Sequence, residues 1–304
     1  MSATIPKSMS GKVWLMLIVL SVLWGGSFFF IGVAVKALPA LTIVTLRVTI
    51  AAIALWLFIL ILRLQVPKNP QVWLAFIGMG ILNNVIPFGL IVWGQTHIAS
   101  GLASILNAMT PIFAVLAAAF LLPDEKPSPL KLIGVLLGFI GVVIMIGVPA
   151  LSDSAHLWAE LAIVAAAMSY ALAGIYGRRF TALGVNPIIT AAGQVTASAM
   201  VLLPMALVVD GTSSLLLANG NTWGAIIALA VVSTSVAYVL YFKILALAGA
   251  TNVLLVTLLV PVSAVLLGTF ILGETLGVIH LIGMGLIALG LSAIDGRLWK
   301  KSTQ

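Results

Sequence analysis

Trp73-Leu74-Ala75 and Trp223-Gly224-Ala225 begin two apolar stretches that correspond residue by residue at a separation of 150 positions. Each stretch has a proline 38 residues after its tryptophan, Pro111 in the first and Pro261 in the second. The correspondence runs without a gap from Trp73 to Leu122. Internal duplication of membrane-spanning segments is typical of transporters, because two half-folds that face opposite ways can move about a shared site.

The correspondence continues, after a shift of one residue, into the last apolar segment of each half. An acidic residue, a Leu-Ile pair and two glycines recur there in the same order. The matched residues include Glu125 with Glu274, Gly134 with Gly283, and Gly141 with Gly290. The duplication therefore predicts two repeats of similar length, residues 1–150 and 151–304, without a separate soluble domain.

The composition indicates that lipid is the main solvent of this chain. Hydrophobic residues make up 62% of the sequence and charged residues only 7%, with a mean hydropathy of +1.28. A soluble domain carries about a quarter charged residues. There is no cysteine, which excludes disulfides and thiolate metal sites, and we expect neither a metal nor a cofactor. The basic residues are scattered between apolar segments, so a nucleic-acid partner is not expected either.

Glycine, proline and charged residues divide the sequence into ten candidate membrane spans. Their expected limits are 13–35, 40–62, 72–95, 98–122, 129–148, 157–177, 185–209, 222–247, 250–272 and 276–295. Because each half holds an odd number of spans, the second half enters the membrane from the opposite side. The expected fold is therefore an all-α membrane protein of ten transmembrane helices in two inverted five-helix repeats.

The basic residues predict the orientation of this fold. If the N-terminus is cytoplasmic, twelve of the 14 lysines and arginines fall on the cytoplasmic side, whereas Lys36 falls outside and Arg47 lies within a span. Cytoplasmic connections of membrane proteins carry the excess of Lys and Arg. We therefore expect both termini to be cytoplasmic and the connection near Asp153 to lie outside.

Several short motifs occur in a characteristic order along these spans. They are Leu23-Trp24-Gly25-Gly26-Ser27 in the first span, Pro39 followed by Arg47 in the second, Asn107-Ala108-Met109-Thr110-Pro111-Ile112-Phe113-Ala114 in the fourth, and Pro261-Val262-Ser263-Ala264 in the ninth. By these motifs nearly the whole chain resembles the drug/metabolite transporter superfamily, in the branch with ten helices and two EamA-type repeats. One departure is Pro123-Asp124-Glu125, where the family usually has Gly-Glu. The resemblance implies a basket of helices around a central cavity and secondary transport of small metabolites, often outward.

Pro111 and Pro261 lie inside otherwise apolar spans and are expected to bend them. Proline lacks a backbone donor and clashes with the carbonyl four residues earlier, which here belongs to Asn107 or Thr257. Non-helical backbone within a membrane is tolerated mainly where protein or a cavity satisfies it. We expect the two bent spans to border a substrate cavity, with kinks satisfied by neighbouring helices as the alternative.

Polar and aromatic residues gather in the middle of several spans, on helical faces that repeat between the two halves. In lipid, a single Ser, Thr or Asn more often bonds one helix to another. The clustering on equivalent spans nevertheless favours a shared substrate-binding site. The predicted lining residues are Trp24, Ser27, Asn83, Asn84, Phe88, Asn107, Tyr170, Thr234, Tyr238 and Thr257.

Arg47 is the one basic residue well inside a span, and its repeat counterpart is Gln194. Both side chains can donate hydrogen bonds to carbonyls of a broken neighbouring helix, whereas Gln cannot replace a counter-ion. Arg47 also lies within snorkelling reach of the outer interface. We expect a structural donor, and the alternative is a clamp for a substrate carboxylate.

The distribution of chemically active residues argues against an enzyme. A membrane protease would need a serine with a mid-span histidine, and a prenyltransferase or phosphatase would need acidic or arginine clusters. All seven acidic residues and all three histidines lie at or near span ends or in connections. Coupling to protons through a buried acid is therefore not supported, whereas uniport or coupling through Glu160 or Glu274 stays open.

We expect a secondary transporter that works by alternating access in the bacterial inner membrane, with a small amphipathic solute such as an amino acid as its substrate. A channel, and a carrier of drug-like or lipid-like solutes, remain alternatives. The glycines Gly134, Gly138 and Gly141 form a small-residue helix face, which we expect to pack within a monomer rather than between subunits.

Overall fold

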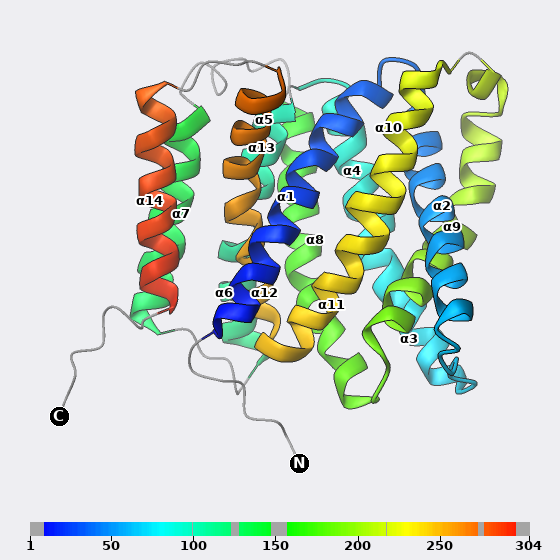
Figure 1. Cartoon of the computed structure of the whole chain (residues 1–304), viewed down its shortest axis with the longest axis horizontal. Helices are drawn as coiled ribbons and strands as arrows, with labels where there is room; N and C mark the ends of the chain where they lie inside the picture. The colour runs from blue at the N-terminus through cyan, green and yellow to red at the C-terminus, as the bar shows by residue number, and fades with distance from the viewer. Residues whose placement is uncertain are drawn as a thin grey trace.

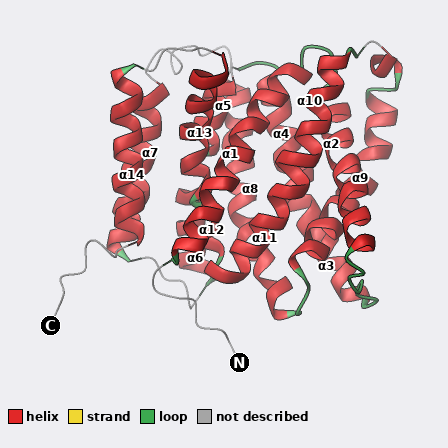
Figure 2. Cartoon of the chain, viewed as in Figure 1, coloured by secondary structure: helices red, strands yellow, loops and turns green. Residues whose placement is uncertain are grey.

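The structure is a computed structural model that describes residues 9–98, 100–122, 128–146, 157–216, 218–272 and 277–295. Within these ranges the regular secondary structure is helical, with no strand among the described residues (Figure 2). In this part of the chain, seven helical segments are long and apolar enough to cross a membrane: Gly11–Ala34, Ala40–Ile61, Pro70–Gln95, Leu102–Leu121, Leu157–Ala182, Pro187–Val209 and Gly220–Ala248. Shorter apolar helices cover Pro129–Ile144, Asn252–Ser263 and Leu281–Ile294. The expectation of an all-α membrane protein is confirmed.

The helices follow one another with short connections. In the first half they are α1 (Gly11–Ala34), α2 (Ala40–Ile61), α3 (Pro70–Gly80), the π-helical turn η1 (Ile81–Val85), α4 (Ile86–Gln95), α5 (Ser100–Asn107), α6 (Thr110–Leu121) and α7 (Pro129–Ile146). In the second half they are α8 (Leu157–Ala182), α9 (Pro187–Val209), the 3-10 turn η4 (Ser213–Leu216), α10 (Gly220–Ala230), the π-helical turn η5 (Val231–Val236), α11 (Ala237–Ala248), α12 (Ala250–Leu254), α13 (Val256–Leu272) and α14 (Val278–Asp295).

Asparagine caps begin three of these helices. The Asn69 side chain accepts a hydrogen bond from Gln71 N at 2.9 Å, and Asn186 accepts one from Ile188 N at 2.9 Å. A proline follows each of these two caps, where its fixed φ suits the first helical residue. Asn219 caps α10 in the same way, through Thr222 N at 3.0 Å. Asn69 and Asn219 are equivalent positions of the two repeats.

The helices stand side by side, with the pair α7 and α14 at one end of the molecule and the pair α2 and α9 at the other (Figure 1). The beginning of α1 and the end of α14 lie at the same face. The two chain ends, Asp153, Glu125 and Glu274 lie outside the described residues. The expected roles of those acidic residues therefore stay predictions.

Close backbone contact joins α7 to α14. A Cβ added to Gly134 would lie 2.5 Å from Gly290 O, and one added to Gly141 would lie 2.7 Å from Gly283 O. Both distances are too short for a side chain, so glycine at these places lets the two helix backbones touch. The glycine face of α7 is thus occupied within the chain, by the helix that carries the equivalent glycines.

The pair α2 and α9 is held by side-chain hydrogen bonds as well as by packing. Trp56 Nε1, in the last third of α2, donates to Thr196 Oγ1 of α9 at 2.8 Å. At the start of α2, Asp210 Oδ2 accepts from both Thr42 N and Thr42 Oγ1, each at 2.8 Å. Asp210 thereby satisfies a backbone donor that the N-cap, Pro39, leaves free. The carboxylate at the end of α9 fixes the beginning of α2.

A π-helical turn interrupts the same segment in both repeats, η1 in Pro70–Gln95 and η5 in Gly220–Ala248. In η5 the hydroxyls of Thr234 and Ser235 donate to the carbonyls five residues earlier, at 2.8 and 3.0 Å. Around η1 the partners come from other helices: Ser169 Oγ donates to Leu82 O at 2.7 Å, and Ser198 Oγ donates to Gly80 O at 3.1 Å. Hydroxyls thus satisfy the loosened backbone inside the membrane.

Two further interruptions separate α5 from α6 and α12 from α13. In the first, Pro111 lies in the first turn of α6, and Thr110 Oγ1 donates to Asn107 O at 2.6 Å. In the second, the interruption falls at Leu255, where Thr257 Oγ1 donates to Leu254 O at 2.8 Å. Pro261 lies inside the helix α13, six residues after this interruption, and the bend expected at Pro261 stays a prediction.

Candidate functional site

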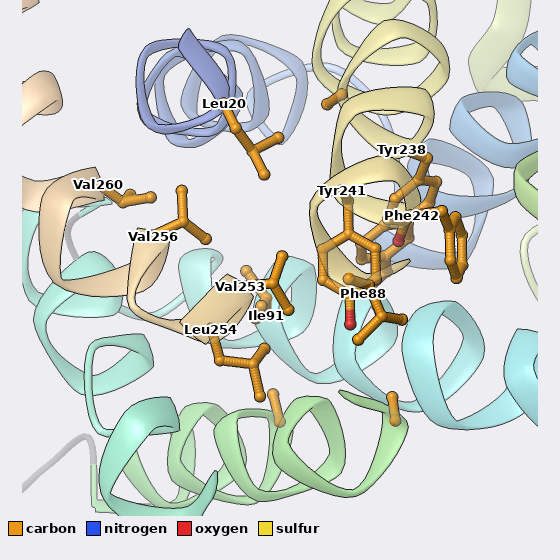
Figure 3. Packing of buried hydrophobic residues seen from close by; sticks show 14 of the residues in the cluster. Leu20, Phe88, Ile91, Tyr238, Tyr241, Phe242, Val253, Leu254, Val256 and Val260 are labelled. Atoms are coloured by element: carbon orange, nitrogen blue, oxygen red, sulfur yellow. The ribbon is translucent and has the colours of Figure 1, made fainter. Parts of the chain in front are cut away.

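A cavity lies between the helices of the two halves. Its walls come from α1, α2, η1, α4, α5, α8, α11, α12 and α13. The lining residues are Trp24, Ser27, Phe28, Ile31, Arg47, Asn83, Phe88, Ile91, Asn107, Tyr170, Tyr238, Tyr241, Leu254, Thr257 and Val260. Figure 3 shows some of these lining residues: Tyr238 and Tyr241 of α11 lie together on one side of the view, Val260 of α13 lies on the opposite side, and Ile91 of α4 lies between them.

The cavity is narrow in this conformation. Its volume is about 40 Å³. One water molecule needs roughly 10–15 Å³ of such a volume. The cavity can therefore hold a few water molecules.

The structure brings together eight of the ten predicted lining residues. They are Trp24, Ser27, Asn83, Phe88, Asn107, Tyr170, Tyr238 and Thr257. Asn84 and Thr234 do not line the cavity, although each side chain is completely buried. Their polar atoms instead form hydrogen bonds with side chains of other helices, as a single polar residue in lipid more often does. Whether the eight bind a substrate stays a prediction.

Asn84 forms the centre of a buried chain of hydrogen bonds. Tyr238 Oη donates to Asn84 Oδ1 and lies 3.1 Å from Asn83 O. Asn84 Nδ2 donates to Ser198 Oγ at 2.8 Å, and Ser198 Oγ lies 2.7 Å from Gln194 O. The chain connects α11 through η1 to α9, so it fixes the tyrosine that forms a wall of the cavity.

Equivalent contacts occur on the two π-helical turns. Asn83 Nδ2 in η1 donates to Gln194 Oε1 in α9 at 3.0 Å. Arg47 Nε in α2 donates to Thr234 Oγ1 in η5 at 2.8 Å. Arg47 and Gln194 are the pair that the two repeats match. Each of them therefore contacts the π-helical turn of the other half, from a helix of the same order.

The environment of Arg47 differs in two respects from the sequence expectation. The acceptor of its hydrogen bond is the Thr234 hydroxyl and not a backbone carbonyl, because Thr234 Oγ1 itself occupies Leu229 O. The side chain is only 4% exposed and its Cζ lies 3.6 Å from the centroid of the Phe88 ring, so it does not snorkel to the outer interface. The guanidinium is part of the cavity wall.

Aromatic rings form a continuous surface beside this guanidinium. The Phe88 ring stacks on Tyr238 with centroids 6.4 Å apart. Tyr238 meets Trp24 edge to face at 6.5 Å, and Trp24 packs against Tyr241 at 5.8 Å. Such rings offer apolar area and a negative face, to which both apolar groups and cations bind.

Two polar atoms in the cavity wall have no hydrogen-bond partner among the described residues. They are Asn107 Oδ1 and Tyr241 Oη, and their side chains are 6% and 1% exposed. Buried polar groups are ordinarily satisfied, by protein, water or a ligand. These two atoms are therefore available for a molecule in the cavity.

The sequence interpretation did not include several lining residues in the predicted site, although helical spacing points to them. Phe28 and Ile31 follow Trp24 and Ser27 at intervals of four residues along α1. Extending each predicted stripe by one turn would have found them. In the described part of the chain, no group of three or more His, Cys, Asp or Glu residues is placed to hold a metal ion.

A family model matches nearly the whole length of this chain. The model of the EamA-like transporter family matches twice, over residues 11–147 and 157–294. The chain belongs to the EamA-like transporter family. The two matches in this EamA protein divide it at the connection where the sequence predicts the boundary between its repeats, and the family identifies a transporter rather than an enzyme.

Curated relatives of this EamA protein carry transporter names. The uncharacterized transporter YoaV of Bacillus subtilis is 26% identical over 92% of the chain and 95% of that protein. The uncharacterized inner membrane transporter YedA of Escherichia coli is 27% identical over 89% and 86%. A protein of Escherichia coli named a probable amino-acid metabolite efflux pump is 25% identical over 97% and 99%. The matches to these proteins, all named as transporters or pumps, thus cover most of the length of each relative.

A solved crystal structure has the same fold as this EamA protein. It superimposes with a TM-score of 0.75 and covers 93% of the chain and 97% of its own, at 20% sequence identity. At that identity the likeness describes the fold alone. The helical architecture of the EamA protein is therefore one that occurs in an experimental structure.

Proposed function

We propose that this protein is a secondary transporter that exports small metabolites, such as amino acids, across the bacterial inner membrane by alternating access. The observation that carries the proposal is the buried cavity between the two halves, which combines aromatic rings, amides, hydroxyls and one guanidinium. The name of the Escherichia coli relative, a probable amino-acid metabolite efflux pump, supports the solute class and the outward direction.

The proposed architecture is ten transmembrane spans in two inverted repeats, residues 1–150 and 151–304. The similar separation of equivalent elements along the chain supports it: α2 and α9 begin 147 positions apart, and η1 and η5 begin 150 positions apart. The pairs α2 with α9 and α7 with α14 unite equivalent helices face to face. Inverted repeats of this kind can exchange conformations, which opens a shared site first to one side and then to the other.

A carrier explains the narrow cavity better than a channel does. A permanent pore needs a continuous aqueous path, whereas a carrier passes through a state in which the site is closed to both sides. A cavity with room for only a few water molecules supports a carrier rather than a permanent pore. The same rings could accept a drug-like or lipid-like solute, which is the alternative to an amino acid.

The proposed location is the bacterial inner membrane, with both termini in the cytoplasm. The excess of basic residues in the even-numbered connections supports this orientation, and the name of the relative YedA supports the membrane. The proposed partners are the small-molecule substrate and the lipid bilayer. A monomer is proposed because the glycine face of α7 is covered by α14 of the same chain.

The function is tested by counterflow in liposomes that contain the purified protein. Vesicles loaded with an unlabelled amino-acid mixture are diluted into labelled amino acids, and a carrier then accumulates label transiently against its gradient. Trp24→Ala should lose most of this exchange because it removes a cavity wall. Trp158→Ala, at a side chain that is 78% exposed on α8, is the matched control and should leave exchange unchanged.

Several outcomes contradict the proposal. Label that only equilibrates indicates a channel, and absence of exchange for every amino acid removes the proposed solute class. Exchange of hydrophobic drugs in the same vesicles, without exchange of amino acids, establishes the alternative.

A further inference from the structure

We propose that Arg47 binds the carboxylate of the transported solute, and that Asn107 and Tyr241 bind its amino group. The cavity then selects zwitterionic amino acids with an apolar side chain. This assignment rests on the proposed transport function and names the residues that give the site its selectivity.

The first step is the charge of the cavity. Arg47 is 4% exposed and lines the cavity, yet neither Glu160 nor Asp210, the described acidic side chains, is in the lining. Asp210 is bound to Thr42 at the start of α2, and Glu160 lies in the first turn of α8. A buried charge without a counter-ion is costly, so a site that keeps one has a use for an anion.

The second step is the geometry of the guanidinium. The described residues supply one hydrogen bond to it, from Nε to Thr234 Oγ1 at 2.8 Å. Phe88 covers one face, with its ring centroid 3.6 Å from Cζ. These two contacts fix the plane of the group and leave the terminal Nη donors for another acceptor. Two parallel N–H donors match the two oxygens of a carboxylate.

The third step is the other polar end of the ligand. Asn107 Oδ1 and Tyr241 Oη are unpartnered among the described residues and line the same cavity as Arg47. Both oxygens can accept hydrogen bonds from an ammonium group. The face of the Trp24 ring, which packs on Tyr241 at 5.8 Å, adds attraction for a cation. A phosphate would meet only one cationic group in this cavity, the guanidinium of Arg47. The single carboxylate of a zwitterion therefore matches the lining better.

The fourth step is the remainder of the lining. Ile31, Ile91, Leu254 and Val260 carry only hydrocarbon into the cavity. They suit an apolar side chain and offer no partner to a second charge. The ligand class is therefore an α-amino acid with an aliphatic or aromatic side chain.

The test compares matched ligands on the purified protein in lipid nanodiscs. L-leucine, L-methionine and L-phenylalanine are each titrated beside the corresponding amide, which lacks the carboxylate, and the corresponding deamino acid, which lacks the amino group. At least one amino acid should bind about tenfold or more tightly than both of its analogues, because each analogue leaves a buried group unpaired. If none of the three amino acids binds, or if the amides bind as tightly as the acids, the assignment is wrong.

Variants then connect the selectivity to the residue. Arg47→Gln should abolish the preference for acid over amide, and Arg47→Lys should retain part of it because the charge remains and the paired donors do not. Arg179→Gln is the matched control, since Arg179 contacts Tyr176 outside the cavity, and it should keep the full preference. If the Arg47→Gln variant does not fold, the ligand series on the unaltered protein and the Arg47→Lys variant still test whether Arg47 binds the carboxylate.

Counterflow separates this inference from the proposed function. Amino-acid exchange that tolerates loss of the carboxylate would refute the role of Arg47 while leaving the transporter function intact. Carboxylate-dependent binding without any exchange would retain the binding assignment and refute the transport proposal.

Discussion

At the scale of the residue, the polar side chains of the interior divide into two groups. Asn84 and Thr234 are fully buried and form hydrogen bonds with side chains of neighbouring helices. Asn107 and Tyr241 keep an unpaired atom in the cavity wall. The first group fixes the helices and the second is available to a ligand, although both consist of the same residue types.

The contribution of the hydrogen bond between Asn84 and Tyr238 to the free energy of unfolding can be measured with a double-mutant cycle. Asn84→Ala and Tyr238→Phe each remove it, so the double variant should be less destabilised than the sum of the single variants, with a coupling of about 0.5–1.7 kcal/mol. Unfolding in detergent micelles gives the free energies. Strictly additive effects would show that this hydrogen bond contributes nothing to stability.

Thr234 tests whether the orientation of Arg47 matters for transport. Thr234→Val keeps the shape of the side chain and removes the acceptor for Arg47 Nε together with the donor to Leu229 O. The guanidinium should then lose its fixed plane, and the half-saturating substrate concentration should rise about tenfold. Ser235→Ala removes a hydroxyl that lies 3.0 Å from Ala230 O and 3.2 Å from Ala51 O of α2, without touching Arg47, and serves as the control. Equal kinetic effects of both variants would assign the change to the π-helical turn rather than to Arg47.

Most of the residues that line this cavity could be predicted from the sequence, but the hydrogen bonds between them and the neighbouring helices could not. A polar stripe on a helix can be located by periodicity, which placed Trp24, Ser27 and Asn107 correctly in one wall. Periodicity does not tell which of two adjacent residues points to the cavity, and Asn83 does whereas Asn84 does not. That choice depends on the local twist of η1.

At the scale of the element, the close helix pair α7 and α14 depends on glycine at particular places. A Cβ at Gly290 would collide with Gly134 O and approach Gly138 N to 2.7 Å, whereas a Cβ at Gly285, on the same helix, would meet nothing within 4 Å. The same substitution at two positions of one helix therefore separates packing from helix propensity.

We expect Gly290→Ala to destabilise the protein by about 1–3 kcal/mol, because the backbones must separate to admit the methyl group. Gly285→Ala should be neutral or slightly stabilising. Thermal unfolding of the two variants in the same detergent makes the comparison. Equal unfolding temperatures would mean that the glycine contacts between α7 and α14 do not hold the pair together.

The membrane spans could be predicted from the sequence, whereas the π-helical turns and the break at Leu255 could not, and the reason is physical. Span positions follow from hydropathy and from capping signals such as Asn69-Pro70 and Asn186-Pro187. A π-helical turn adds one residue without altering hydropathy, so η1 and η5 leave no mark in such a pattern. The break at Leu255 has neither glycine nor proline next to it. A pattern of glycine, proline and hydropathy therefore does not predict it.

At the scale of the whole molecule, the orientation in the membrane follows from charge and can be checked from the ends of one helix. Lys36 precedes α2 and Lys68 follows it, and both side chains are exposed. Since the natural chain has no cysteine, single cysteines at these places can be labelled without background. Lys36→Cys should react with an impermeant reagent in whole cells, and Lys68→Cys only after permeabilisation. The reverse pattern would invert the topology.

The matched positions of Arg47 and Gln194 carry a consequence for the origin of the chain. A dimer of two identical ancestral halves would bring two arginines into one apolar interior, each against the opposite π-helical turn, and like charges there repel strongly. Once the two halves share one polypeptide, each can mutate alone, and a single arginine can serve a ligand with one negative end. Fusion thus permits a polarised site inside a symmetric scaffold, and Gln194→Arg should bring the ancestral conflict back as loss of folded protein.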